Sequence, residues 1–117
     1  MSKQYRASVR GLGGSPTLEG RYRGFDLGYA PVWHPDADGG RQCAGLVRVV
    51  TVTIRLDQGK DDPVAALDGL IKNQVDLRLT GLSLRGWIVT AAFRQEADVQ
   101  GRPTGATVEF RIEGVKE

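Results

Sequence analysis

The amino-acid sequence predicts a mainly β protein of about six or seven strands with one short α-helix at about residues 63–73. Two patterns carry this prediction. Several segments alternate apolar and polar residues with a period of two, which is the spacing of a half-buried strand. A single segment repeats its apolar residues at three- and four-residue steps, as an amphipathic helix does. The 117 residues include 16 glycines, a number typical of a turn-rich β protein, and we expect one domain over residues 1–117.

The first half of the chain is expected to hold three strands. Residues 4–10 alternate and predict a short strand, which the glycines and the proline of residues 11–16 end. Residues 18–29 predict one long or bulged strand, because glycines inside it permit bends. Residues 31–45 predict a long loop, since they contain two prolines and three glycines, and loops of this length are commonly functional. Residues 46–56 predict the clearest strand, with one face formed by Leu46, Val50, Val52, Ile54 and Leu56 and interrupted by Arg48.

The helix is predicted to begin at Asp62 and Pro63. Aspartate caps the exposed N–H groups of a first helical turn, and proline fits the first helical position because it needs no hydrogen bond there. The apolar stripe that carries the helix to residue 73 consists of Val64, Leu67, Leu70 and Ile71. A helix of about three turns needs to pack against a sheet to persist.

Three further strands are predicted in the second half, at residues 75–80, 84–94 and 107–113. Between the last two, residues 96–105 predict a polar turn region. In the strand at residues 84–94, one face is expected to carry Trp87, Val89, Ala91 and Phe93.

Composition and charge exclude several classes of function. The 16 basic and 14 acidic residues are interspersed and leave a net charge of only +2, so no specific nucleic-acid binding is expected. No apolar run approaches the roughly 20 residues of a membrane helix, and the polar first residues lack the apolar segment of a signal peptide. We therefore expect no membrane contact and a protein that is cytoplasmic on synthesis. The single cysteine, Cys43, excludes an internal disulfide and a thiolate-clustered zinc site.

The region around His34 is the first place where chemistry is expected. Asp36 and Asp38 precede a glycine, as carboxylates do in calcium loops, but no third side-chain oxygen and no downstream glutamate occur at the required spacing. A solvated turn in which an aspartate binds the backbone is the favoured interpretation. His34 and Cys43 could form a base and a nucleophile, yet no local motif supports this pair, and a tolerated thiol is favoured.

Two other candidates carry less chemistry. Asp61 and Asp62 are consecutive at a helix start, where carboxylates are normally caps. Residues 11–15 are rich in glycine but lack the lysine of a phosphate-binding loop. We therefore expect no cofactor, no metal and no catalytic residue.

Arginine accounts for 12 of the 16 basic residues. Arginine favours planar, bidentate pairing with carboxylates and is enriched at protein interfaces, so we expect charge pairs along the sheet and across subunits. Arg48 is the sharpest anomaly, because it interrupts an apolar face; it is expected to extend to a rim or to meet a carboxylate from another element or subunit. The arginines inside predicted strands are Arg21, Arg23, Arg48, Arg55, Arg78, Arg85, Arg94 and Arg111.

The order of elements resembles the tube proteins of contractile injection systems, namely the Hcp proteins of type VI secretion and, more distantly, phage tail tube proteins. The parts that carry the resemblance are the strand within 18–29, the loop 31–45, the strand 46–56, the helix after it, and the closing strands 84–94 and 107–113. The resemblance covers most of residues 18–113 and rests on arrangement, without a signature motif.

The resemblance implies that the strands form a small two-sheet β-barrel. It also implies a non-enzymatic structural subunit that forms rings, expected to be hexamers, and stacks them into a tube. The implied partners are other copies of the chain, together with sheath, baseplate or effector proteins, within a secreted particle or a virion. Residues 1–17 have no counterpart in that family and are expected to be flexible or to contact a neighbouring subunit. The residues expected at the subunit interface are Trp33, His34, Asp36, Asp38, Arg41 and Arg48.

Two alternatives remain open at this point. Another phage-type structural protein, such as a capsid decoration or a tail adaptor, would form a trimer or a capsid-bound monomer in place of a ring. A small ligand-binding or enzymatic β-barrel would act through the loop 31–45, where Trp33, His34, Asp36 and Asp38 are the residues to test.

Overall fold

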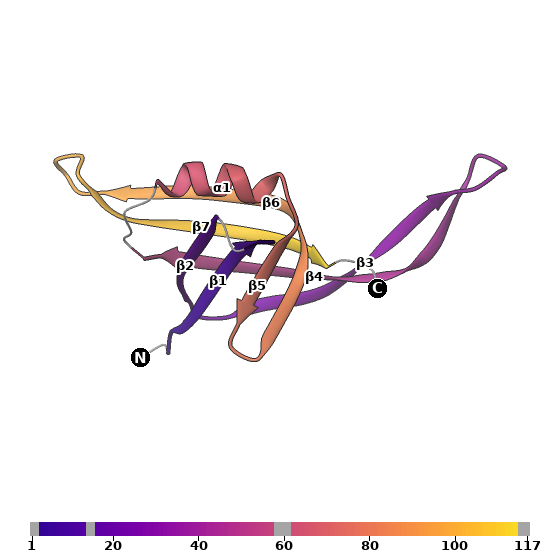
Figure 1. The fold of residues 1–117 in the computed structure, drawn as a ribbon, viewed down its shortest axis with the longest axis horizontal. Coiled ribbons are helices and arrows are strands. Elements are labelled where there is room, and N and C mark those ends of the chain that lie inside the picture. The colour runs from indigo at the N-terminus through magenta and orange to yellow at the C-terminus, as the bar shows by residue number, and fades with distance from the viewer. Residues whose placement is uncertain (1–2, 14–15, 58–61, 115–117) are drawn as a thin grey trace.

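The computed structural model describes residues 3–13, 16–57 and 62–114, and these ranges form seven strands and one helix (Figure 1). In chain order the elements are β1 (Tyr5–Gly11), β2 (Thr17–Tyr22), β3 (Phe25–Pro35), β4 (Arg41–Leu56), α1 (Pro63–Ile71), β5 (Val75–Leu79), β6 (Leu82–Ala97) and β7 (Pro103–Gly114). A mainly β fold with about seven strands and one short helix is confirmed.

The strands form a single antiparallel sheet with ring-like pairing, where the resemblance implies two packed sheets. The order is β2-β1-β5-β6-β7-β4-β3, and β2 also pairs with β4 through Gly20–Leu56 and Arg21–Arg55. Six strands therefore follow one another in a ring, and β3 continues from β2 along the same edge of β4. The molecule is elongated, 60 × 31 × 30 Å, because two hairpins extend from opposite ends of this ring (Figure 1).

The core lies inside the ring. β7 contributes three fully buried residues at alternate positions, Val108, Phe110 and Ile112, as its sequence pattern predicts. α1 packs against β1, β2 and β6 and buries Leu67 and Leu70. No helix in the described ranges is long and apolar enough to cross a membrane.

The start of α1 is confirmed. The Asp62 side chain accepts a hydrogen bond from the Val64 N–H (3.0 Å), and Pro63 occupies the first turn. The helix ends at Ile71, with Lys72 as its C-cap, two residues before the predicted end. Asp61 lies outside the described residues.

β4 confirms the predicted strand and its predicted apolar face, in which four of the five residues are buried; only a core position for Leu46 is wrong. Val50, Val52, Ile54 and Leu56 are buried, whereas Leu46 is exposed. By alternation Leu46 belongs to the core-facing side of β4. It precedes Val49, which is the first residue of β4 that pairs with β7. The strand therefore extends past the core, and Val47 and Val49 are buried on its opposite face.

The predicted face of β6 is also wrong. Leu84 and Ile88 are buried, while Trp87 and Val89 are exposed. The register with β7 shifts between Ile88 and Thr90, so Val89 is an extra residue in the strand. Such a bulge moves the inward side chains by one position, which places Ala91 and Phe93 against the core.

Three predicted connections are corrected as well. The predicted strand 18–29 is divided by a bend at residues 23–24 into β2 and β3. The predicted loop 31–45 is wrong: it is mostly a hairpin of β3 and β4, with a turn over residues 36–40. Proline does not prevent this pairing, because β3 is an edge strand whose outer side needs no hydrogen bond. The predicted turn region 96–105 likewise shortens to residues 98–102.

The predicted strand at residues 4–10 is confirmed as β1. It pairs with β2 on one side and β5 on the other, and it buries Ala7 and Val9. Over residues 5–11 the chain is therefore an integral part of the sheet. The expected contact of residues 1–17 with a neighbouring subunit stays a prediction.

An ion pair links the start of β1 to the residue after β4, and it yields the first prediction. Arg6 Nη2 lies 2.7 Å from Asp57 Oδ2, and this hydrogen bond holds the pKa of Asp57 below its usual value. We expect Arg6→Gln to raise the pKa of Asp57 toward the ordinary value of about 3.9, as measured by NMR titration of the carboxyl carbon.

The sign of the pH effect follows from the lowered pKa. The ion pair contributes stability above the pKa of Asp57 in the unfolded chain, and this contribution is lost as the pH falls through the lower pKa of the folded state. Arg10→Gln, on the same strand, is the control and leaves the pKa of Asp57 unchanged. An unchanged pKa in Arg6→Gln would contradict the prediction.

Candidate assembly surface

The outer halves of β3 and β4, with the turn between them, form an arm that extends beyond the ring (Figure 1). We call residues 29–48 the β3–β4 arm. Its strands pair from Tyr29–Arg48 to Pro35–Arg41, whereas β7 covers β4 only from Val49 onward. The arm is therefore a two-stranded ribbon, and the outer edge of β3 has no partner among the described residues.

One face of this arm is apolar. Leu27, Tyr29 and Trp33 alternate along β3, and Leu46 lies opposite Pro31 on β4. The exposed fractions of these side chains are 46% for Leu27, 63% for Tyr29, 50% for Trp33 and 63% for Leu46. We call these four residues the apolar strip. Leu27 lies opposite the buried Val50, so the strip continues the core-facing side of the sheet past the end of the core.

Arg48 lies on the same face of the arm, directly opposite Tyr29. It is exposed, and it has no ion-pair partner among the described residues. The prediction that Arg48 reaches a rim is consistent with this position at the point where the arm leaves the core.

The end of the arm is a tight turn built on Asp36. The Asp36 carboxylate accepts the N–H of Asp38 (3.0 Å), and its backbone pairs with Gly39 and Gly40. Gly39 has φ +84°, a conformation that favours glycine. The expected aspartate turn is therefore present, and the carboxylate of Asp38 has no ion-pair partner among the described residues.

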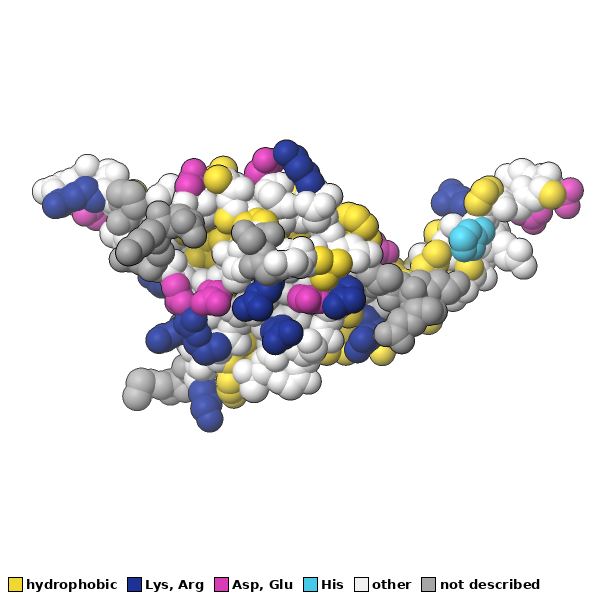
Figure 2. All heavy atoms as spheres, viewed as in Figure 1, with side chains coloured by type: hydrophobic (Ala, Val, Ile, Leu, Met, Phe, Trp, Pro, Cys, Tyr) yellow, Lys and Arg dark blue, Asp and Glu magenta, His cyan; other side chains and the backbone are white. Residues whose placement is uncertain are grey.

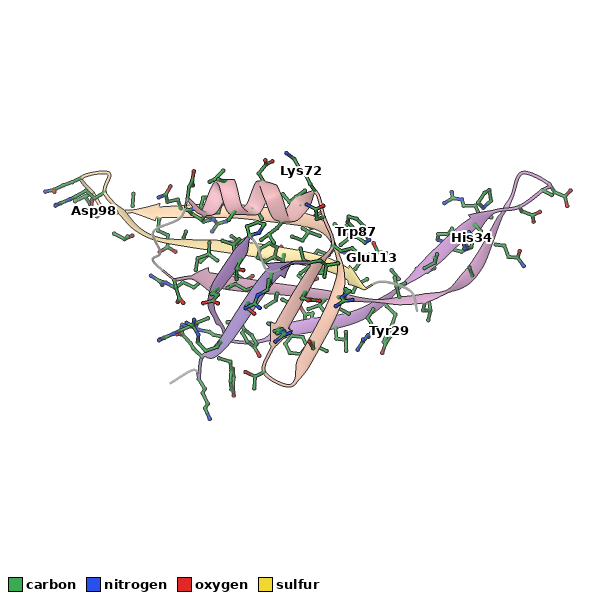
Figure 3. The ribbon with its side chains drawn as sticks, in the orientation of Figure 1. Tyr29, His34, Lys72, Trp87, Asp98 and Glu113 are labelled. Carbon is green, nitrogen blue, oxygen red and sulfur yellow. The ribbon has the colours of Figure 1, made fainter. Side chains whose placement is uncertain are left out.

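The arm places His34 and Cys43 on opposite faces. Cys43 lies opposite Trp33, whereas His34 lies opposite Gln42, and consecutive side chains on a strand alternate in direction. The Cys43 thiol is 3.4 Å from the backbone oxygen of Gly45. The pair is therefore not arranged as a base and a nucleophile. Figure 3 shows His34 far out on the arm, and Figure 2 shows hydrophobic side chains around it with acidic side chains at the end.

The remaining sequence candidates hold no assembled site within the described part of the chain. No group of three or more metal-binding side chains comes together there. Asp62 is occupied in capping α1. In the glycine-rich segment, residues 14 and 15 lie outside the described residues, and Gly11 ends β1.

A second surface, which sequence reasoning missed, lies at the other end of β4. A cavity of about 590 Å³ opens there at the bend between β2 and β3. Three arginines line it (Arg21, Arg23 and Arg55), together with the carboxylates of Asp26 and Glu109. We call it the arginine pocket. Arg21 and Arg55 are direct cross-strand neighbours, an arrangement in which like charges repel.

The sequence indicates the strands that carry the arginines of this pocket but not that these strands are neighbours. Arg21 and Arg55 both occupy outward positions of predicted strands, but their pairing depends on the contact between β2 and β4, which are separated by the whole of β3. The hairpin of β6 and β7 follows the predicted pair of strands joined by a polar turn region, with a shorter turn. Its turn repeats the aspartate and glycine spacing of the first turn, with Asp98 bonding to Gln100 and Gly101 at φ +80°.

Comparison with protein-family models found no match to this sequence, and comparison with curated proteins found none either.

Proposed function

We propose that this chain is a non-enzymatic structural subunit that self-assembles into rings, expected to be hexamers, which stack into a tube of a contractile injection system or a phage tail. The observation that carries the proposal is the apolar strip. Tyr29, Trp33 and Leu46 stay exposed on a ribbon that lies outside the core of its own subunit, and Leu27 continues this surface toward the core. Exposed apolar surface of this kind marks a protein interface.

The free edge of β3 supports the same proposal. An unpaired strand edge is a template for a strand of another chain, and soluble proteins usually cover or shorten such edges. β3 is 11 residues long and its edge is not covered by any described element. Assembly of identical subunits would cover both the edge and the apolar strip, since heterologous contacts close into rings when the rotation permits.

The proposal predicts that the arm controls the oligomeric state and leaves folding intact. We expect negative-stain images and sedimentation velocity of the purified chain to show rings or stacked rings. In Tyr29→Ser/Leu46→Ser the association is expected to weaken by roughly thirtyfold or more, as for loss of an interface hot spot. Its circular dichroism and melting temperature should stay near those of the unmodified chain, because neither side chain is buried in the subunit.

Val99→Ser is the matched control. Val99 is an apolar residue that is even more exposed than Tyr29 and Leu46, but it lies in the turn of the other hairpin, so its replacement should leave the rings intact. A chain that stays monomeric at high concentration would contradict the proposal. A trimer would favour a capsid decoration or a tail adaptor instead.

A further inference from the structure

The arginine pocket is lined by three arginines and two carboxylates, those of Asp26 and Glu109. Arg21 and Arg55 face each other across β2 and β4, and Arg23 follows at the bend. Among the described residues neither lining carboxylate forms an ion pair with these arginines. Two further carboxylates lie nearby. Asp57 attracts Arg21 but is already bound to Arg6, and Glu96 lies 3.9 Å from Arg55 on an exposed surface.

The turn of the β3–β4 arm carries the opposite charge. Asp36 and Asp38 present two carboxylates that have no ion pair in the described residues, and Ala37, Gly39 and Gly40 keep the turn narrow. The turn of the other hairpin, between β6 and β7, differs both in the pairing of its carboxylate and in the size of its side chains. Its Asp98 is paired with Arg102 (3.4 Å), and it carries the larger Val99 and Gln100.

The arm cannot bring its turn to the pocket of its own chain. The turn precedes Arg41 at one end of β4, and Arg55 lies near the other end of this 16-residue strand. A strand of that length spans about 50 Å. β4 is paired along its whole length, so it cannot fold back.

From these charges and positions we infer that the turn at residues 36–40 of one copy binds in the arginine pocket of the next copy. Asp36 and Asp38 then lie among Arg21, Arg23 and Arg55, and Arg41, at the base of the turn, faces the carboxylates that also line the pocket. The donor and the acceptor are at opposite ends of β4, so the contact is head to tail. This inference rests on the proposed self-assembly and identifies the surface that receives the arm.

The test uses one variant for each side of the contact. The turn variant, Asp36→Asn/Asp38→Arg, retains a side-chain acceptor for the turn and reverses its charge. The pocket variant, Arg21→Glu/Arg23→Glu, reverses the pocket, and its new glutamate faces Arg55 in a favourable cross-strand pair. We expect each variant alone to associate at least about tenfold more weakly than the unmodified chain at physiological salt, by sedimentation velocity.

An equimolar mixture of the two variants is the decisive measurement. The intact turn of the pocket variant fits the intact pocket of the turn variant, and the positive turn of the turn variant meets the negative pocket of the pocket variant. The mixture is therefore expected to assemble, with the two variants alternating, at concentrations where neither variant assembles alone. Gln100→Arg, which adds a positive charge at the equivalent position of the other turn, is the control and should assemble normally.

The outcomes separate this inference from the proposed function. If the unmodified chain assembles and both variants assemble equally well, the pocket is not the acceptor, while the structural role stands. A mixture of the two variants that contains only monomers would also overturn the inference. If the unmodified chain is monomeric, the proposed function and this inference both fail.

Discussion

Gly20→Ala is expected to open the contact between β2 and β4 and to destabilise the fold severely. A Cβ atom at this position would lie 2.2 Å from the backbone oxygen of Arg55 and 2.7 Å from Cγ2 of Ile54. The backbone oxygen cannot move without separating the two strands that complete the ring. We expect a loss of about 3 kcal/mol or more in the free energy of unfolding, at or above the usual range for overpacking, measured by urea denaturation.

Gly28→Ala is the matched control for this prediction. Gly28 is also a strand glycine, but no atom lies within 4 Å of a Cβ built on it. Its replacement should leave stability unchanged or raise it by up to about 1 kcal/mol, because alanine has fewer conformations in the unfolded chain. Equal stability of Gly20→Ala and the unmodified chain would mean that the two strands do not approach as closely as the structure has them.

Phe110→Ala is expected to have the second large effect, since Phe110 is the largest fully buried side chain. It lies at the centre of β7, opposite Val52 on one side and Ala91 on the other. Its removal leaves a cavity inside the ring and should cost about 3–5 kcal/mol, which corresponds to a fall in melting temperature of about 10–20 °C. Thermal unfolding followed by circular dichroism measures the change.

Phe110→Leu distinguishes a cavity from a general intolerance of β7 to substitution. Leucine fills more of the space than alanine, and hydrophobic substitutions that nearly conserve volume usually cost less than about 1.5 kcal/mol. We therefore expect Phe110→Leu to unfold close to the unmodified chain. If Phe110→Ala also unfolds near the melting temperature of the unmodified chain, the ring interior is not the stabilising core.

The elements that sequence analysis predicted best are those whose pattern depends on local spacing alone. β7 keeps a strict alternation from Val108 to Ile112, and α1 combines a cap at Asp62 with an apolar stripe. Local spacing failed where a strand changes its environment along its length. β6 contains a bulge at Val89, and β4 enters the core only from Val49 onward, so residues that alternate in the same way are buried in one part of a strand and exposed in another.

The candidate interface was predicted in part. The sequence placed Trp33, His34, Asp36, Asp38 and Arg41 in one connection that extends from the fold, and these residues do lie together on the β3–β4 arm. The prolines and glycines of that connection predict an irregular loop. They destabilise a strand less at the edge of a sheet, where β3 lies, and the connection therefore forms a hairpin. In the sequence Arg48 interrupts an apolar face of its strand, and in the structure it lies where the arm leaves the core.

By itself, the sequence determined that this protein is mainly β, that its one short helix starts at Asp62, and that its alternating apolar residues require a shared core. Those properties follow from spacing between neighbours along the chain. Only the tertiary structure decided that the strands pair in a ring, that the presumed loop is a ribbon with an apolar strip, and that Arg21 meets Arg55. These features depend on contacts between residues distant in the sequence, and such contacts are chosen by the packing of the whole chain, which no local pattern records.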